Sequence, residues 1–339
     1  MNTNPRRIDV HHHILPPNFV SALNSLNIPW TGGPEVPSWS LARAHDTMGE
    51  LGIDAAVASP SPGVYWGGDT GFAVKLARET NEFVANVFRD DPEHFGGFAT
   101  MPLPDVDAAL DELEYAYDSL GFDGVVLYSS QGGRYLGDPS FDPLFEELER
   151  RKAVVFIHPT TLPPGADATG LTIPLGVAEF TFDTTRAVAN MLYSGALERY
   201  PSIRYIVSHA GGAIPYLAWR IAGASYLPEL RDRAPKTDGL ALLQKMHYDT
   251  ALSTSEFVFG ALKQFVPTSH VLFGSDFPYV TPAVLQAEKV RHREQHCSHR
   301  RGPRSDRSRE CAATVPPIRV ITLTIWQTPM TRPKHDRVW

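Results

Sequence analysis

The sequence lacks several features that would assign it to a protein class at once. Its 339 residues include only two cysteines, Cys297 and Cys311, so no disulfide framework is expected. No apolar run approaches the roughly 20 residues that a membrane-spanning helix needs. The first ten residues, MNTNPRRIDV, contain no apolar stretch of the secretory kind. We therefore expect a cytoplasmic protein with no membrane partner.

Positive charge is scarce in most of the chain and concentrated at its end. Residues 1–290 contain 20 Lys and Arg against 34 Asp and Glu, whereas residues 291–339 contain 11 against 4. An acidic body disfavours nucleic acid as a partner. The tail has little helical periodicity, and its His and Cys spacings match none of the usual zinc modules. We expect one domain over 1–290, followed by an atypical basic tail over 291–339 that is disordered or frame-shifted.

Eight short runs, rich in apolar and β-branched residues, alternate with amphipathic stretches. Several runs are continuously apolar, which is typical of parallel strands buried on both faces. The expected strands are 8–11, 55–59, 95–100, 124–129, 154–158, 203–209, 245–250 and 270–276. No Gly-rich dinucleotide loop follows the first run, which argues against an open doubly wound sheet. Eight strand–helix alternations in a domain of this length therefore predict a (β/α)8 TIM barrel.

The amphipathic stretch between the third and fourth runs shows how the helices are delimited. Apolar residues recur at helical spacing from Val106 to Leu120, and acidic residues occupy the other face. Asp105 or Asp107 is the expected N-cap, and Gly121 the expected end.

Two histidines in the first run indicate a metal site. Alternate side chains of a strand share a face, so His11 and His13 of the segment DVHHH face one way and His12 the other. Two imidazoles at the end of a strand form a bidentate platform for a transition metal. A polar strand end or a chance run of histidines is the alternative.

Three further strand ends carry His or Asp. His158 ends VVFIH, His209 ends IRYIVSH and Asp276 ends HVLFGSD. The carboxyl ends of barrel strands converge on one mouth, so four such ends favour a shared site over isolated core residues. Gly211 and Gly212 follow His209, where glycine would let the backbone come close to a ligand.

The remaining histidines and the fourth strand bear on how many metal ions are bound. The fourth run, GVVLYSS, has no lysine at its end, where two-metal hydrolases of this architecture often need a bridging modified lysine. One metal ion is therefore the better interpretation. We place His45, His94, His247 and His270 in structural or surface positions.

The motifs together resemble the amidohydrolase superfamily. The segments IDVHHHILPP, VVFIHPT, FDTTRAVANMLYSG, YIVSHAGG and LFGSDFPY span residues 8–279, and their order and spacing are similar to those of this family. The resemblance is to the branch that contains aminocarboxymuconate semialdehyde, γ-resorcylate and 6-methylsalicylate decarboxylases. The segments PSWS and SPGVYWG are most similar to the last of these groups. The tail departs from the family, whose members finish with a helix after the eighth strand.

The resemblance implies a cofactor and an assembly. It implies one divalent metal ion, Zn²⁺ first and Mn²⁺ as the alternative, held by four ligands. These are His11, His13, His158 and Asp276. It also implies that His209, beside the metal, acts as a base or proton shuttle, and that the protein is a homodimer.

The residues and the resemblance predict a metal-dependent, non-oxidative decarboxylase, that is, a carbon–carbon lyase. The substrate would be a small hydroxy-aromatic or enol carboxylic acid that chelates the metal. Asp276, assisted by His209, would supply the proton to the carbon that loses CO2. A metal-dependent hydrolase of a lactone or amide, in which His209 deprotonates a metal-bound water, is the alternative. A catalytically inactive barrel that binds a partner is the third hypothesis.

Four residues are candidates for contacts with the substrate. Arg186 could pair with a carboxylate, and Phe182, Tyr65 and Trp66 could contact the ring. A surface position for the arginine and core packing for the aromatic residues are the alternatives. We expect the long connection 159–182, after the fifth strand, to cover the substrate.

Overall fold

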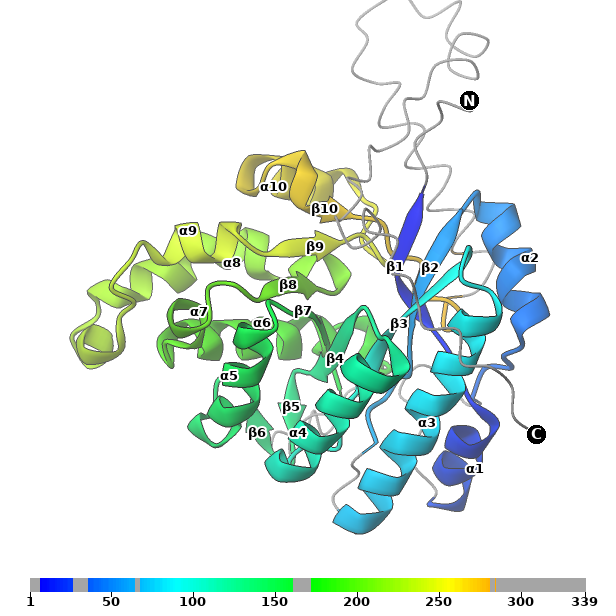
Figure 1. Cartoon of the computed structure of the whole chain (residues 1–339). Coiled ribbons are helices and arrows are strands. Elements are labelled where there is room, and N and C mark those ends of the chain that lie inside the picture. The colour runs from blue at the N-terminus through cyan, green and yellow to red at the C-terminus, as the bar shows by residue number, and fades with distance from the viewer. Residues whose placement is uncertain (1–6, 27–35, 65–67, 161–171, 281–283, 285–339) are drawn as a thin grey trace, which may run out of the picture.

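Eight parallel strands form the centre of the structure (Figure 1), a computed structural model that describes residues 7–26, 36–64, 68–160, 172–280 and residue 284. Neighbouring strands pair in the order β1-β2-β3-β4-β7-β8-β9-β10. Their bounds are β1 (Ile8–His13), β2 (Ala55–Ser59), β3 (Phe95–Thr100), β4 (Gly124–Tyr128), β7 (Val154–His158), β8 (Arg204–Val207), β9 (His247–Asp249) and β10 (Val271–Leu272). A two-stranded hairpin, β5 (Ser130–Gln131) and β6 (Arg134–Tyr135), follows β4. Each of the eight expected strands is present, and the predicted (β/α)8 barrel is confirmed.

The barrel closes between β1 and the segment that follows β10. The Val10 N–H donates to Phe273 O at 3.0 Å, and the His13 N–H donates to Phe277 O at 2.6 Å. These contacts are isolated bridges rather than a regular ladder, because the chain turns away after β10. Asp276 lies in this irregular segment and is thereby brought against β1.

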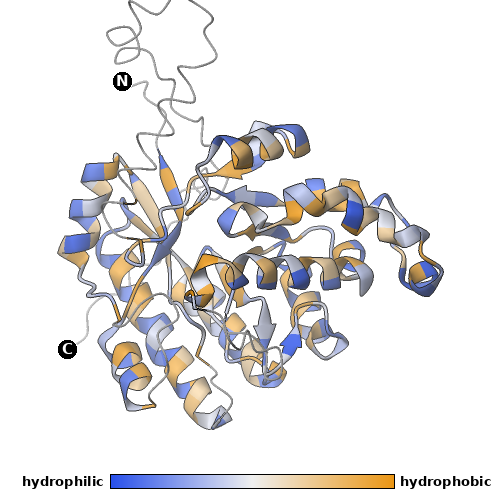
Figure 2. Cartoon of the chain, turned by 180° about the vertical axis from the view of Figure 1, so that it is seen from behind, coloured by the Kyte–Doolittle hydropathy of each residue, from blue (hydrophilic) through white to orange (hydrophobic). Residues whose placement is uncertain are grey.

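Helices surround the strands and bury their apolar faces against them. The helices are α1 (Pro17–Ser25), α2 (Leu41–Leu51), α3 (Thr70–Asp90), α4 (Val106–Glu114), α5 (Asp142–Arg150), α6 (Glu179–Tyr193), α7 (Ala196–Arg199), α8 (Ile214–Gly223), α9 (Gly239–Gln244) and α10 (Glu256–Phe265). Hydrophilic and hydrophobic residues alternate along these helices, as expected for elements that have one face on the core (Figure 2). None of the helices in the described ranges is long and apolar enough to span a bilayer.

The barrel interior is filled by side chains from nearly every strand. The cluster consists of Val10, Val57, Phe98, Val126, Tyr128, Val154, Phe156, Ile206 and Leu272. Such layers make the barrel a packed core rather than a pore. Polar chemistry is therefore confined to the strand ends.

The helix after β3 begins and ends where the sequence predicts. Asp105 accepts a hydrogen bond from the Ala108 N–H at 3.0 Å, and Gly121 ends the helix with a φ of 80°. Between them the chain differs from the expectation, since α4 changes at Tyr115 into a π-helix that runs to Leu120. The spacing of apolar residues did not reveal this, because Tyr117 and Leu120 of the π-helix still pack against the core.

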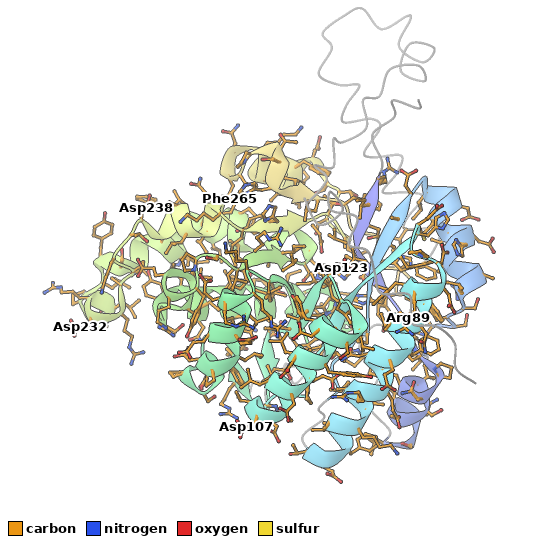
Figure 3. All side chains as sticks on the ribbon, in the orientation of Figure 1. Arg89, Asp107, Asp123, Asp232, Asp238 and Phe265 are labelled. Carbon is orange, nitrogen blue, oxygen red and sulfur yellow. The ribbon has the colours of Figure 1, made fainter. Side chains whose placement is uncertain are left out.

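An arm built from α8, two short 3-10 segments and α9 projects from the barrel (Figure 1). The 3-10 segments are Ala224–Tyr226 and Pro228–Arg233. Asp232 lies at the tip of the arm and Asp238 at the start of α9 (Figure 3).

Candidate metal centre

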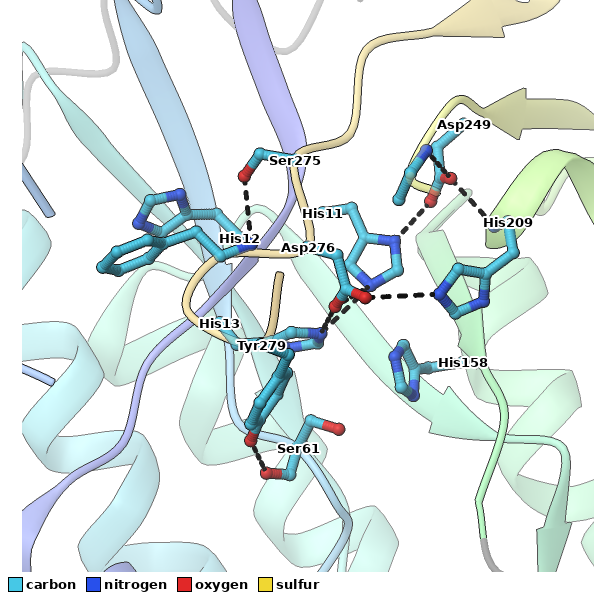
Figure 4. Close-up of polar contacts among 12 residues, drawn as sticks. His11, His12, His13, Ser61, His158, His209, Asp249, Ser275, Asp276 and Tyr279 are labelled. Atoms are coloured by element: carbon cyan, nitrogen blue, oxygen red, sulfur yellow. Dashed lines mark hydrogen bonds and ion pairs between the residues drawn. The ribbon is translucent and has the colours of Figure 1, made fainter. Parts of the chain in front are cut away.

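Four side chains meet at the mouth formed by the carboxyl ends of the strands (Figure 4). They are His11 and His13 of β1, His158 of β7 and Asp276, and each offers a ligand atom within 4.8 Å of all the others. The Nε2 atoms of His11 and His13 are 3.0 Å apart. Asp276 Oδ1 lies 3.2 Å and 3.1 Å from these two atoms. These separations approach the ~3.3 Å edge of a tetrahedron whose metal–ligand bonds are about 2.0 Å long.

The Nδ1 atom of each of the three histidines in this cluster contacts a hydrogen-bond acceptor. The contacts are Asp249 Oδ2 for His11 (2.7 Å), Ser59 O for His13 (3.2 Å) and Pro159 O for His158 (2.7 Å). A neutral imidazole that donates from Nδ1 carries a lone pair on Nε2. Three lone pairs and a carboxylate oxygen thus converge on one point, and this donor set fits a divalent cation.

The electrostatics of the cluster favour one positive charge. Burial opposes a charge on His11, but the carboxylates of Asp249 and Asp276 outweigh it and raise the pKa of His11 to about 10. Burial lowers the pKa of His13 and, together with the neighbouring histidines, holds the pKa of His158 well below its usual value. Burial would raise the pKa of Asp276, but His11 and the hydrogen-bonding histidines hold it well below its usual range. His11 therefore holds a proton at neutral pH, and a metal cation that binds its Nε2 atom must displace that proton.

The backbone that presents these groups is strained. Asp276 has a φ of 56° and His209 a φ of 52°, in the left-handed region that costs a non-glycine residue roughly 1 kcal/mol or more. Such strain is typical of functional sites. Gly274 makes room for the first ligand, because a Cβ there would lie 2.8 Å from the His11 Cβ.

His209 lies beside the four ligands rather than among them. Its Nε2 is 3.6 Å from Asp276 Oδ2, whereas the other oxygen of Asp276 faces His11 and His13. Its Nδ1 has no hydrogen-bond partner within the described part of the chain. This position suits proton transfer better than metal ligation.

His12 faces away from the cluster, as strand alternation predicts. Its ring stacks on Phe277 with 4.7 Å between centroids, and its Nδ1 lies 3.1 Å from Asp9 Oδ2. The pairing of β1 with β2 shifts register between Asp9 and His12, yet His11 and His13 still share one face.

Asp249 is a site residue that the sequence reasoning missed. Besides His11, it contacts the backbone of His209 and Ala251, whose N–H groups donate to its Oδ1 at 2.9 Å and 3.0 Å. One carboxylate thus orients two site histidines. The signal was present, because Asp249 stands at the carboxyl end of the seventh strand, where the rule that selected Asp276 applies equally.

A cavity of about 500 Å³ opens onto the cluster. His158, His209 and Asp276 form its polar end, and Val177, Phe180, Leu252, Tyr279 and Val280 are among its apolar walls. Its volume is typical of small-molecule sites. None of the described residues that line it is Lys or Arg.

Two of the four expected substrate contacts lie in the described part of the chain, and neither lines this cavity. Arg186 and Phe182 of α6 do not line this cavity: Arg186 Nη2 lies 3.8 Å from Glu179 Oε2, and Phe182 is 45% exposed. Residues two apart in a helix point to nearly opposite faces, so α6 presents Phe180 to the cavity instead of Phe182. Tyr65 and Trp66 lie outside the described residues.

The connection after the fifth strand also contributes to the cavity. Residues 161–171 lie outside the described residues, but Pro174, Gly176 and Val177 of the same connection line the cavity. The described part therefore borders the space where we expect the substrate.

The two glycines after His209 approach protein rather than a ligand, which corrects the interpretation from sequence. A Cβ on Gly212 would lie 2.1 Å from Thr181 O, and one on Gly211 would lie 2.6 Å from the Tyr248 ring. Glycine is needed here because the turn after β8 packs tightly against α6 and β9.

Comparison with known proteins adds independent information. The sequence matches the amidohydrolase family profile over residues 8–296. It is 37% identical over 287 residues to 6-methylsalicylic acid decarboxylase from Penicillium expansum, an alignment that covers 80% of this chain and 85% of that one. A solved amidohydrolase II structure superposes with a TM-score of 0.77 at 27% identity, covering 87% of this chain and 92% of that one. A dihydroxybenzoic acid decarboxylase from Polaromonas sp., solved with bound manganese, superposes with a TM-score of 0.74 at 22% identity, covering 84% and 90%.

Proposed function

The chain belongs to the amidohydrolase family, and from this premise we propose that it is a metal-dependent, non-oxidative decarboxylase of a hydroxy-aromatic carboxylic acid resembling 6-methylsalicylate. The observation that carries the proposal is the convergence of three imidazoles and the Asp276 carboxylate at the polar end of an apolar cavity. The relative from Penicillium expansum, by its name, decarboxylates 6-methylsalicylic acid.

We assign one divalent ion to the candidate metal centre. Three imidazoles and one carboxylate suit Zn²⁺, and Mn²⁺, which the Polaromonas structure contains, is the competing ion. When bound, the cation neutralises the substrate carboxylate and the hydroxyl oxygen beside it.

The chain's own residues handle the proton. Decarboxylation breaks the bond between the ring carbon and the carboxylate, releases CO2 and leaves the electron pair on the ring carbon, which takes up one proton. His209 and Asp276 both line the cavity, and their facing atoms are 3.6 Å apart, so we assign this proton to the pair. The Nδ1 atom of His209 has no hydrogen-bond partner among the described residues, so we assign the replacement proton to it.

The cavity walls favour a substrate with a single carboxylate. Apolar side chains such as Val177, Phe180 and Leu252 suit a ring and a methyl substituent. A second carboxylate would enter this space without a cationic partner among the described lining residues, which is costly in a buried site. We therefore expect 6-methylsalicylate to be preferred over a dicarboxylate such as 5-carboxyvanillate.

The proposal is tested by CO2 release in deuterated water. The chain, stripped by a chelator and reloaded with Zn²⁺ or Mn²⁺, should release CO2 from 6-methylsalicylate and place one deuterium on the carbon that carried the carboxylate. His209→Asn should retain the metal and lose turnover by ~10²–10⁴-fold, the usual contribution of a general acid–base group. Hydrolysis of lactones without CO2 release from any hydroxybenzoate would contradict the proposal and favour the hydrolase alternative.

We also propose that the chain forms a homodimer through its projecting arm. Tyr216 and Trp219 of α8 are 87% and 71% exposed, and Tyr226 is 84% exposed. Phe257 of the neighbouring α10 is 81% exposed. Tyr216 and Trp219 are three residues apart in α8 and therefore lie on the same side of that helix, and large exposed aromatic side chains are typical of protein–protein interfaces.

A further inference from the structure

A second group of metal-ligating side chains lies outside the candidate metal centre. It consists of His45 in α2, Asp91 at the end of α3 and His94 in the turn before β3, and each offers a ligand atom within 4.8 Å of the others. The turn leads into the amino-terminal end of β3, whereas the candidate metal centre lies at the carboxyl ends of the strands. The two groups are therefore at opposite ends of the barrel.

The carboxylate of Asp91 stands between the two imidazoles. Its Oδ2 lies 2.9 Å from His45 Nε2, and its Oδ1 lies 2.7 Å from His94 Nδ1. The two rings are edge-to-face, with centroids 5.2 Å apart. The side chains are 38%, 23% and 45% exposed for His45, Asp91 and His94, so solvent and a cation can reach all three.

The three residues are held in place by the surrounding fold. The backbone N–H groups of Phe95 and His94 donate to Asp91 O at 3.0 Å and 3.3 Å, which fixes Asp91 and His94 in one tight turn. The backbone O of His94 accepts from the Ala56 N–H at 2.8 Å, which ties that turn to β2. The ring of His45 packs edge-to-face on the buried Phe95, with centroids 5.3 Å apart. The fold itself therefore holds the three ligand atoms close together.

The donor set is that of a transition metal. Two imidazoles and one carboxylate suit Zn²⁺, Co²⁺ or Ni²⁺, and water can complete the coordination of a site that is open to solvent. Asp90 and Glu93, both exposed and adjacent to the ligands in sequence, add negative charge that favours a cation.

We propose that His45, Asp91 and His94 form a second, peripheral site for a Zn²⁺-like cation. The bound ion would clamp α2 to the turn between α3 and β3. This end of a barrel usually serves stability rather than chemistry, so we expect the ion to raise thermal stability and to leave catalysis unchanged. A cation that binds the folded chain and not the unfolded chain stabilises it by mass action.

The proposal is tested by counting ions on the full chain. After chelator treatment, Zn²⁺ titration and desalting, His45→Ala and Asp91→Asn should each retain one ion fewer than the wild type, as measured by plasma mass spectrometry. Glu93→Gln is the matched control, because it removes a charge from the same turn without removing a ligand, and should retain as many ions as the wild type with at most a modest loss of affinity. The histidines and cysteines of residues 291–339 are present in all variants, so they cancel in the difference.

Two further measurements separate a metal site from a hydrogen-bonded triad. The first uses His158→Ala, which lacks a ligand of the candidate metal centre. Zn²⁺ should raise the melting temperature of this variant by a few degrees. The double variant His158→Ala, His45→Ala should show no such rise. Anomalous diffraction from crystals soaked in Co²⁺ should show a peak between the three side chains. Two results would overturn the proposal. One is an equal ion count in the wild type and in the His45→Ala and Asp91→Asn variants. The other is an anomalous peak at the candidate metal centre with no peak between His45, Asp91 and His94.

Discussion

Neighbouring histidines of one strand have different surroundings in this structure. His11 and His13 direct their Nε2 atoms at each other and at Asp276, whereas His12 stacks on Phe277 on the far side of the strand. All three are buried, so burial alone does not distinguish a ligand from a packing residue. The direction of the lone pair does, and it is set by the partner of the opposite ring nitrogen.

This contrast predicts how metal content responds to substitution. His158→Ala should lose the metal, since the remaining ligands bind a cation weakly. His12→Ala removes a buried ring of the same size and should keep about one ion at the candidate metal centre, although it loses the stacking on Phe277. Metal analysis after dialysis compares the two variants directly. Equal loss of metal in both variants would contradict the inference that His12 points away from the metal.

Asp249 gives a second prediction at this scale. Asp249→Asn keeps the shape of the side chain but replaces the anionic partner of His11 Nδ1 with a neutral amide. Loss of such an orienting carboxylate typically weakens metal affinity by about 10–100-fold, which a competition titration with a chromophoric chelator can measure. Asp238→Asn, at the start of α9 on the projecting arm, is the control and should leave affinity unchanged. Unchanged affinity in Asp249→Asn would assign this carboxylate to backbone support alone.

Among the strands, β9 is short and begins with a histidine whose protonation is linked to folding. His247 stacks on His270 with 4.5 Å between ring centroids, and its Nδ1 lacks a partner within the described residues. Burial, with the nearby His270, lowers the pKa of His247 from 6.5 to about 4. The folded chain therefore resists protonating this residue in a range where the unfolded chain does not.

The sign of the resulting pH dependence follows from the lowered pKa. The stability that His247 contributes is complete above pH 6.5 and is lost as the pH falls from about 6.5 to about 4. His247→Gln cannot titrate, so its free energy of unfolding should fall less over this range, by about 1–2 kcal/mol after allowance for partial exposure. Denaturant titrations of metal-stripped wild type and variant at pH 4.5 and 7 measure this difference. Parallel pH profiles for the two proteins would exclude His247 as the source.

The elements that the sequence predicts well are those defined by a simple period. Short runs rich in apolar residues identified every barrel strand, and the ends of three of them supplied the four ligands of the candidate metal centre. Three things could not be read in this way. The closure of the barrel depends on isolated bridges after β10, the face of α6 depends on where that helix begins, and the contact of His45 with Asp91 joins residues far apart in sequence. Each is set by tertiary packing, for which one sequence carries no periodic signal.

Viewed as a whole, the molecule extends beyond its barrel through the arm of α8 and α9 (Figure 1). A dimer through this arm predicts that Trp219→Glu, which places a charge among the exposed aromatic residues, yields a monomer by analytical ultracentrifugation. Leu26→Glu is the control, because Leu26 is 47% exposed at the end of α1, away from the arm. A wild-type chain that sediments as a monomer at micromolar concentration would contradict the proposed assembly.

The last prediction concerns residues 291–339, a part of the sequence that lies outside the described residues. Its Arg-rich composition and sparse apolar spacing predict that it cannot bury enough surface to offset its ordering entropy. Every residue of the candidate metal centre precedes it, and the family match ends at residue 296. A chain that ends at residue 296 should therefore unfold cooperatively and retain its metal and its decarboxylase activity.

Aggregation is the property that this truncation should change. The segment 318–326, IRVITLTIW, is an apolar run of high β-propensity, so its removal should raise solubility. A second truncation, after residue 317, removes this run but keeps most of the arginines and should give the same gain. Static light scattering during heating measures both effects, and limited proteolysis tests the domain boundary itself. If the chain ending at residue 296 loses cooperative unfolding while the full chain resists proteolysis throughout 291–339, the tail is an ordered part of the domain and its assignment here is wrong.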